Sequence, residues 1–224
     1  GRESVVELIA LAAVAGEHAL LIGPPGTAKS EVVRRLARVI DARWFSYLLG
    51  RFTEPSELFG PIDLKRLREG ELETRTEGML PEAEIAFLDE VFLGSTAILN
   101  TLLGILNERR FRRGHTSMDC ALRVCVGASN ALPDDPSLAA FADRFLVHIF
   151  VAPLADSRIE DLLSIGGAVE AGPAAEVGKV GKVASLADLD ALAAAARAVS
   201  LAPVVDELAF AVRLLRKAGI ALSD

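Results

Sequence analysis

The segment with the clearest chemical potential is a glycine-rich loop that ends in lysine and serine: Gly23-Pro24-Pro25-Gly26-Thr27-Ala28-Lys29-Ser30. A short apolar run, residues 18–22, precedes the loop, and residues 31–40 repeat apolar side chains at helical spacing. Strand, loop and helix in this order predict a phosphate-binding loop, in which backbone N–H groups and the positive end of the helix hold a polyphosphate. An ordinary turn between a strand and a helix is the alternative.

Individual loop positions have separate predicted roles. Lys29 would reach the β- and γ-phosphates as a point charge, and the Ser30 hydroxyl would ligate Mg²⁺. Glu31 opens the following helix and is counted among the nucleotide-binding residues. Ala28 stands where the G-x-x-x-x-G-K-[ST] pattern has glycine. Alanine is acceptable there if its backbone is helical, because only a positive φ or a close backbone approach requires glycine.

A pair of carboxylates supplies the second half of the predicted chemistry. Asp89 and Glu90 follow four apolar residues, 85–88, which predict a buried strand that ends at a ligand crevice. Asp89 would hold Mg²⁺ opposite Ser30, and Glu90 would polarise the attacking water. Acid pairs at strand ends are common, so this interpretation depends on the phosphate loop that precedes it.

Two more polar residues stand at the ends of predicted elements. Asn130 follows a strand predicted to end at residue 129 and could orient the attacking water or sense the γ-phosphate, although an asparagine in a turn is the alternative. Arg144 ends a helix predicted over residues 136–142. We expect it beside the crevice of the sheet, as a cation directed at a neighbouring site.

The elements that would position these residues alternate along the chain. A first helix is predicted from Ser4, its cap, to Ala15, with Glu7 completing a capping box. Strands are predicted at 18–22, 43–49, 85–88, 122–129 and 146–150, and helices at 31–40, 95–107 and 136–142. This alternation predicts an α/β fold with a parallel sheet and helices on both faces, and the aromatic strand 43–49 is placed near an edge.

Two segments interrupt the alternation. Residues 50–84 are polar and irregular, with short helices predicted at 54–59 and 63–69 and a hairpin around 71–75; a role in function is favoured over a decorated surface, because loops beyond ~15 residues are usually functional. Four arginines surround a second predicted hairpin that turns at Gly114: Arg109, Arg110, Arg112 and Arg113. They predict either a solvated face or a grip on a partner or neighbouring subunit. Nucleic-acid binding ranks lower, because only Phe111 could stack on bases.

Composition limits the function classes. The chain has 224 residues, and no apolar run approaches the ~18 residues of a membrane span. Its formal charge, 24 − 31 = −7, argues against nucleic acid as the main partner. Cys120 and Cys125 lack C-x-x-C spacing and are expected to be reduced thiols of a cytosolic protein. The histidines lack metal-ligand spacing, so no transition-metal site is expected.

Over residues 1–150 the sequence resembles the AAA+ ATPases, and within them the MoxR family, particularly its RavA-like members. The resemblance rests on Gly23–Ser30 (Walker A), 52–61, 78–84, Phe87–Glu90 (Walker B), 98–103, 107–109, 128–130 (sensor 1) and 143–145 (arginine finger). It implies a P-loop αβα sandwich over residues 1–153, followed over 154–224 by a linker and a partial helical lid.

The resemblance also implies a mode of action. Members bind ATP and Mg²⁺ between the subunits of a ring, usually a hexamer, that remodels or matures a protein client, often with a partner that bears a von Willebrand A domain. Arg144 would then serve the ATP of the next protomer, and Arg2 would lie near the adenine. The insert of residues 50–84 and the hairpin of residues 109–121 would face the central pore.

The tail departs from this pattern. A helix near Ser157, a Gly/Ala-rich connector over 165–183 and helices over 186–199 and 203–218 are predicted, the last with Gly219 at its end. They resemble the beginning of a lid that stops before the expected sensor-2 arginine. We therefore expect this chain to bind ATP with impaired turnover.

Two other functions remain open. One is a nucleotide-gated scaffold with negligible turnover, although a pure binder would not need the acid pair Asp89-Glu90. The other is a DNA-acting motor, which depends on the arginine hairpin alone.

Overall fold

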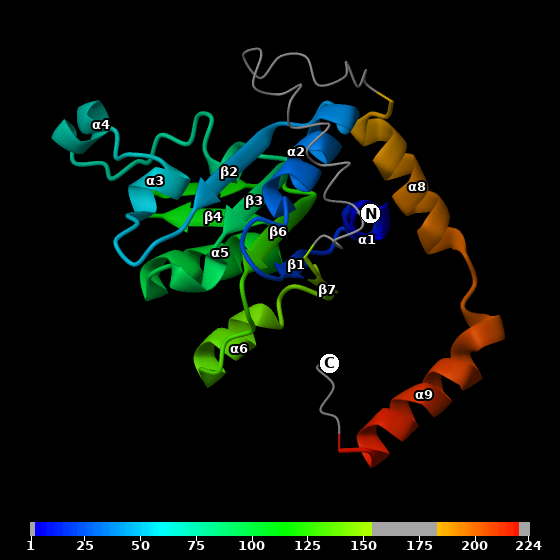
Figure 1. The fold of residues 1–224 in the computed structure, drawn as a ribbon. Coiled ribbons are helices and arrows are strands. Elements are labelled where there is room, and N and C mark those ends of the chain that lie inside the picture. Colours follow the sequence, from blue (N-terminus) through cyan, green and yellow to red (C-terminus); the bar gives the residue numbers. More distant parts are fainter. Residues whose placement is uncertain (1–2, 154–182, 220–224) are drawn as a thin grey trace, which may run out of the picture.

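The computed structural model describes residues 3–153 and 183–219, and at its centre is a five-stranded sheet of order β2-β3-β6-β1-β7 (Figure 1). The strands are β1 (Ala19–Ile22), β2 (Trp44–Leu48), β3 (Ile85–Asp89), β6 (Val124–Ser129) and β7 (Val147–Phe150). Every neighbouring pair is parallel. The predicted parallel α/β fold is confirmed, and β2 is an edge strand as expected.

Helices cover both faces of this sheet. The bounds of these four helices are α1 (Glu3–Ala15), α2 (Lys29–Ile40), α5 (Thr96–Glu108) and α6 (Pro136–Ala142). Leu21 of β1 is buried in the core that contains α1 and α2, whereas Leu20 is buried in the core that contains α5 and α6. Successive strand residues point to opposite faces, so one apolar strand fills both cores. The result is the predicted αβα sandwich.

Of the helix caps predicted at Ser95 and Ser4, one is present in the structure. Ser95 caps α5, because its Oγ accepts from the Ile98 N–H at 3.4 Å. The cap predicted at Ser4 is wrong, since α1 already includes Glu3 and Ser4 therefore lies inside the helix.

The insert between β2 and β3 holds two short helices, α3 (Pro55–Phe59) and α4 (Leu64–Arg68). The hairpin predicted around residues 71–75 is wrong. Instead, Ile62 and Thr74 form an isolated antiparallel bridge, and the Asp63 N–H donates to the Glu73 carbonyl at 2.8 Å. The segment after α4 therefore runs back antiparallel to the segment before α4, and together they form a closed lobe with this helix.

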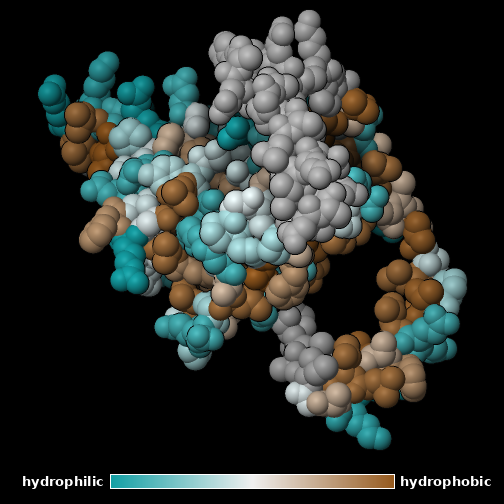
Figure 2. Space-filling view, in the orientation of Figure 1, coloured by the Kyte–Doolittle hydropathy of each residue, from teal (hydrophilic) through white to brown (hydrophobic). Residues whose placement is uncertain are grey.

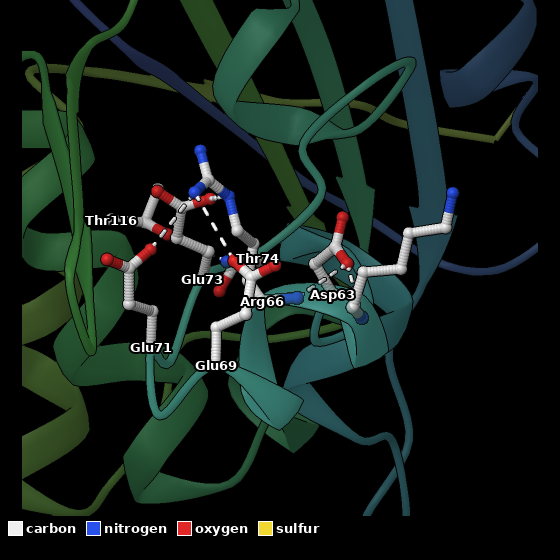
Figure 3. A network of polar contacts seen from close by, with 8 residues as sticks. Asp63, Arg66, Glu69, Glu71, Glu73, Thr74 and Thr116 are labelled. Atoms are coloured by element: carbon white, nitrogen blue, oxygen red, sulfur yellow. Dashed lines mark hydrogen bonds and ion pairs between the residues drawn. The ribbon is translucent and has the colours of Figure 1, made fainter.

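Polar contacts within this lobe centre on Arg66 (Figure 3). Its guanidinium pairs with Glu71 and Glu73, each at 3.2 Å. The Asp63 carboxylate accepts from the Lys65 N–H at 2.8 Å, a cap on α4 that lowers the pKa of Asp63. Exposed ion pairs stabilise little by themselves, so the cap and the bridge set the shape of the lobe.

The predicted arginine hairpin is confirmed as β4 (Arg110–Arg113) and β5 (Thr116–Asp119). It packs against the insert, because the His115 N–H donates to the Leu72 carbonyl at 2.8 Å and the Thr74 N–H donates to the Thr116 hydroxyl at 2.7 Å. Thr74 and Thr116 are 42 positions apart in the sequence, so the insert and the hairpin form one structural unit through contacts between distant segments.

The tail is described only from Val183 onward, so the helix predicted near Ser157 and most of the predicted connector lie outside the described residues. The two later helices are present as α8 (Leu186–Ala198) and α9 (Val205–Lys217). Leu189 of α8 is buried in the core that contains α1, whereas α9 buries none of its side chains. Figures 1 and 2 show α9 away from the sandwich, with hydrophobic side chains along it. No helix in the described part of the chain is both long and apolar enough to cross a membrane.

Candidate functional site

The glycine-rich loop joins β1 to α2, as predicted, and two of its glycines are required by geometry. Gly26 has a φ of 76°, a conformation that glycine adopts without strain. A Cβ on Gly23 would lie 2.2 Å from the carbonyl oxygen of Val151. The Gly23 N–H also donates to the Ser129 carbonyl at 3.1 Å, which ties the loop to β6.

The conformation of Ala28 differs from the expectation. Its φ and ψ are 59° and 29°, which is left-handed rather than right-handed helical backbone. The proposed reason for tolerating alanine is therefore wrong, because this position has the positive φ that favours glycine. A left-handed conformation costs a residue with a side chain about 1 kcal/mol. Ala28 thus adds local backbone strain at the start of α2.

The interior of the loop is rich in hydrogen-bond donors. The buried Lys29 ammonium donates to the carbonyl oxygens of Gly23 at 2.7 Å and Pro24 at 3.2 Å. Among the residues that the structure describes, none accepts from the backbone N–H groups of Gly26, Thr27 or Ala28. Backbone donors and an ammonium at the start of a helix form a site for an anion such as phosphate.

The acid pair lies at the carboxyl edge of the sheet, where its parallel strands end. Leu88 is buried in the core on the α5 side, so the next residue, Asp89, lies on the α2 side. That is the face on which α2 begins with Lys29 and Ser30. A carboxylate and a hydroxyl are oxygen ligands of the kind that Mg²⁺ prefers, so these residues fit the predicted ion.

Glu90 and Asn130 lie next to each other. Glu90 has a left-handed backbone, with a φ of 50°, and Asn130 Nδ2 donates to its Oε1 at 2.8 Å. Strand β6, which Asn130 follows, lies between β3 and β1. Asn130 is therefore placed between the acid pair and the glycine-rich loop, where it restrains one oxygen of the Glu90 carboxylate.

Arg144 lies at the amino edge of the sheet, where the strands begin, opposite the carboxyl edge that holds the acid pair. It precedes β7, which runs parallel to β1 with Val147 opposite Ala19, whereas the glycine-rich loop follows β1. The expectation that Arg144 lies beside the crevice of its own sheet is therefore wrong. Its exposed side chain lines a hollow of about 920 Å³ at the amino edge, where the strands begin.

The sequence analysis missed a buried polar cluster beside this hollow. His18 is 2% exposed; its Nδ1 accepts from the Cys125 N–H at 2.9 Å, and its Nε2 therefore carries the proton and donates to the Leu106 carbonyl at 3.1 Å. The Arg109 guanidinium contacts both His18 and the Gly16 carbonyl. Burial, and then the charge of Arg109, lower the pKa of His18 to about 3. The imidazole is thus neutral, and the only sequence signal was a polar residue at the start of an apolar strand.

The arginines of the hairpin are all engaged. Arg110 pairs with Asp119 and Arg112 with Glu108, both at 3.1 Å, and Arg113 donates to the Gly60 carbonyl at 3.0 Å. Phe111 is fully buried and stacks on Phe59, with 5.5 Å between ring centroids. The one aromatic side chain that the nucleic-acid interpretation needed therefore cannot reach a base.

The remaining candidate residues are Glu31, Arg2 and the two cysteines. The Glu31 carboxylate pairs with Arg35 at 2.8 Å on the outside of α2, which directs it away from the loop interior. Arg2 lies outside the described residues. Cys120 and Cys125 are buried and free, and burial raises the pKa of Cys120 to about 11 and that of Cys125 to about 12, so neither is poised as a nucleophile.

Comparison with known proteins gives a family and a fold. The model of the MoxR domain in the MoxR-vWA-beta-propeller ternary systems matches residues 1–193. The uncharacterized proteins MJ0812 and MJ0079 of Methanocaldococcus jannaschii are each 44% identical over 146 residues, 65% of this chain and 39% and 38% of theirs. Structural protein ORF618 of Acidianus two-tailed virus is 32% identical over 157 residues, 25% of its length. The chain thus spans less than two fifths of these curated relatives.

A solved structure gives the same fold. The crystal structure of a candidate ATPase from Cytophaga hutchinsonii superimposes with a TM-score of 0.74, covering 98% of this chain and 67% of that one. The two sequences are 22% identical, so this likeness supports the fold alone.

Proposed function

The chain belongs to the MoxR family of AAA+ ATPases, and from this premise we propose that it binds Mg-ATP at Gly23–Ser30 and hydrolyses it in an oligomeric ring. The observation that carries the proposal is the hydrogen bond between Asn130 and Glu90 beside a donor-rich phosphate loop. Anion binding alone would not need a carboxylate held at this place. The proposed reaction is the transfer of the γ-phosphoryl group to water.

Binding would be divided between backbone and side chains. The N–H groups of the loop and the Lys29 ammonium would hold the phosphates. Ser30 and Asp89 would hold Mg²⁺, partly through water, and the ion supplies neutralisation of the charge on the phosphates. The left-handed backbone of Ala28 would help to aim these N–H groups at the phosphates.

Water activation would fall to Glu90. Its carboxylate would accept a hydrogen bond from the attacking water and then take its proton. Asn130 donates to one carboxylate oxygen, so its role is to fix the direction in which the other oxygen points. This is a positioning role, and it requires no charge on Asn130.

Arg144 would act on the site of a neighbouring copy. It lies at the amino edge of the sheet, whereas the phosphate loop of the same chain is at the carboxyl edge. A head-to-tail contact, in which the amino edge of one copy meets the carboxyl edge of the next, closes into a ring when the rotation allows it. An arginine supplied in trans is worth ~10³ to 10⁵ in rate, so an isolated copy should hydrolyse ATP poorly.

The output of the cycle would be remodelling or maturation of a protein client. The matched model describes ternary systems with vWA and beta-propeller components, and we propose a von Willebrand A domain protein and a β-propeller as partners of this chain. The joined insert and hairpin are the proposed surface that faces the pore. A RavA-like subtype, a hexamer, a cytoplasmic location and a domain boundary near residue 153 remain parts of this proposal.

ATP turnover per site, measured over a range of protein concentrations, tests the proposal. We would compare this chain with a version extended past Asp224 and measure ATP binding in parallel. Turnover that rises with concentration in the extended form supports a site shared between copies. Tight binding with no turnover in either form would instead support a nucleotide-gated scaffold.

A further inference from the structure

Two exposed apolar side chains lie beside the acid pair. Leu48 is 64% exposed and stands opposite Asp89 in the register of β2 with β3. Phe52 is 96% exposed, in a turn closed by hydrogen bonds between Gly50 and Thr53 at 2.8 and 3.1 Å. The turn holds the phenyl ring in solvent at the carboxyl edge. Single exposed apolar residues are common, so exposure alone says little, and it is the position of these two beside the acid pair that suggests a contact surface.

A complementary feature lies at the amino edge. Leu146 is 68% exposed and lines the same hollow as Arg144, two positions earlier in the chain. Within the described part of the chain, no carboxylate pairs with the Arg144 guanidinium. An apolar side chain and an unpaired cation thus stand together on this edge.

We propose that Leu48 and Phe52 of one copy pack against Leu146 of a second copy, and that this contact carries Arg144 of the second copy to the Asp89-Glu90 end of the first. The inference rests on the proposed function and adds to it an apolar contact that positions the Arg144 guanidinium. Because the two surfaces lie on opposite edges of one sheet, they cannot meet within a chain.

Charge complementarity favours a second copy as the occupant. The carboxyl edge carries Asp89 and Glu90 and gains the charge of a bound triphosphate, whereas Arg144 offers a cation beside Leu146. The hollow is also lined by Glu17, Asp143 and Arg109. The Arg109 guanidinium contacts His18 and the Gly16 carbonyl, so the exposed positive charge beside Leu146 is that of Arg144. An aromatic anchor and an arginine are the residue types that dominate interface energetics.

Two variants and a matched control test this contact in the full-length protein. Phe52→Asp disrupts the carboxyl edge, and Leu146→Asp disrupts the amino edge. Leu64→Asp is the control, because Leu64 is 69% exposed and lies on α4, which Figure 1 shows apart from the strands of the sheet. Sedimentation in the presence of ATP would report assembly, a fluorescent ATP analogue would report binding, and Phe52→Ala would repeat the test with a milder change.

We expect both edge variants to bind ATP like the wild type, to sediment as monomers and to lose turnover at least about tenfold, as after removal of an interface anchor. An equimolar mixture should recover part of the turnover. The intact amino edge of the Phe52→Asp copy can meet the intact carboxyl edge of the Leu146→Asp copy, which completes one site in each pair.

Three results would overturn the contact. The edge variants could assemble like the Leu64→Asp control, or the mixture could turn over ATP no faster than its components. If the turnover per site of the wild type still rises on assembly, either result rules out this contact but does not contradict the proposed function. If turnover per site of the wild type does not depend on concentration, the shared site and the contact are both wrong.

Discussion

Asn130 Nδ2 donates a hydrogen bond to Glu90 Oε1 over 2.8 Å, although the residues are 40 positions apart. The bond forms because β6 lies beside β3 and both strands end at the same edge of the sheet. It restrains one oxygen of the carboxylate, and within the described part of the chain no donor is bonded to the other. This arrangement is suited to a base that must hold water in one direction.

Glu90→Gln should separate ATP binding from hydrolysis. Glutamine keeps an oxygen that can accept from Asn130, but it cannot take a proton from water. We expect unchanged ATP affinity, loss of turnover and a longer-lived ATP-loaded assembly. Binding of a fluorescent ATP analogue and phosphate release would be measured on the same preparation, and normal turnover by this variant would show that Glu90 is not the base.

Ala28→Gly should stabilise the nucleotide-free protein. Glycine relieves the strain of a left-handed backbone at φ 59°. It also raises the conformational entropy of the unfolded chain, which offsets part of the gain in stability. We expect the free energy of unfolding to rise by up to about 1 kcal/mol in urea titrations. Gly26→Ala is the matched control and should lower it, because Gly26 has a φ of 76°. Equal destabilisation by both substitutions would contradict the strain at Ala28.

His18 should make stability depend on pH. Its folded pKa of about 3 lies below the ordinary 6.5, so between these values the unfolded chain binds more protons. Stability is therefore fully present above pH 6.5 and falls as the pH drops toward 3. The slope is about 1.4 kcal/mol per pH unit for one proton.

The comparison that isolates this effect is His18→Gln. Glutamine cannot titrate, so the part of the slope due to His18 should vanish between pH 6 and 4, while the carboxylates titrate as before. Free energies of unfolding would be measured at matched pH for both proteins. Identical slopes would mean that His18 is not held neutral by the fold.

Much of the fold could be predicted because the signals are local. The loop from Gly23 to Ser30 and the acids after residue 88 stand directly at the ends of apolar strands, and alternation of strands and helices predicts a parallel sheet. The position of Arg144 could also have been predicted. A residue just before a parallel strand lies at the amino edge of the sheet, whereas the sequence analysis placed Arg144 at the carboxyl edge.

Other features depend on contacts between distant residues. His18 meets Arg109 across 91 positions, and Thr74 meets Thr116 across 42, so no sequence window contains either pair. The left-handed backbone of Ala28 is likewise absent from the residue pattern, because alanine favours helical dihedrals. These parts of the site required the structure.

Arg144→Ala should abolish hydrolysis without affecting ATP binding. The guanidinium lies away from the phosphate loop of its own chain, so nothing at the binding site changes. We expect turnover to fall by ~10³ or more. Arg68→Ala, an exposed arginine of α4, is the control and should keep turnover. Equal loss of binding and turnover in Arg144→Ala would contradict a role in trans.

The most direct test of a site shared between copies is the turnover of an equimolar mixture of Lys29→Ala and Arg144→Ala in a chain extended past Asp224. The first variant cannot hold the phosphates but still presents Arg144, and the second binds ATP but lacks the cation. Each alone should be inactive, and the mixture should regain turnover as its concentration rises. If the mixture stays inactive while the wild type hydrolyses ATP under the same conditions, Arg144 does not act on the neighbouring site.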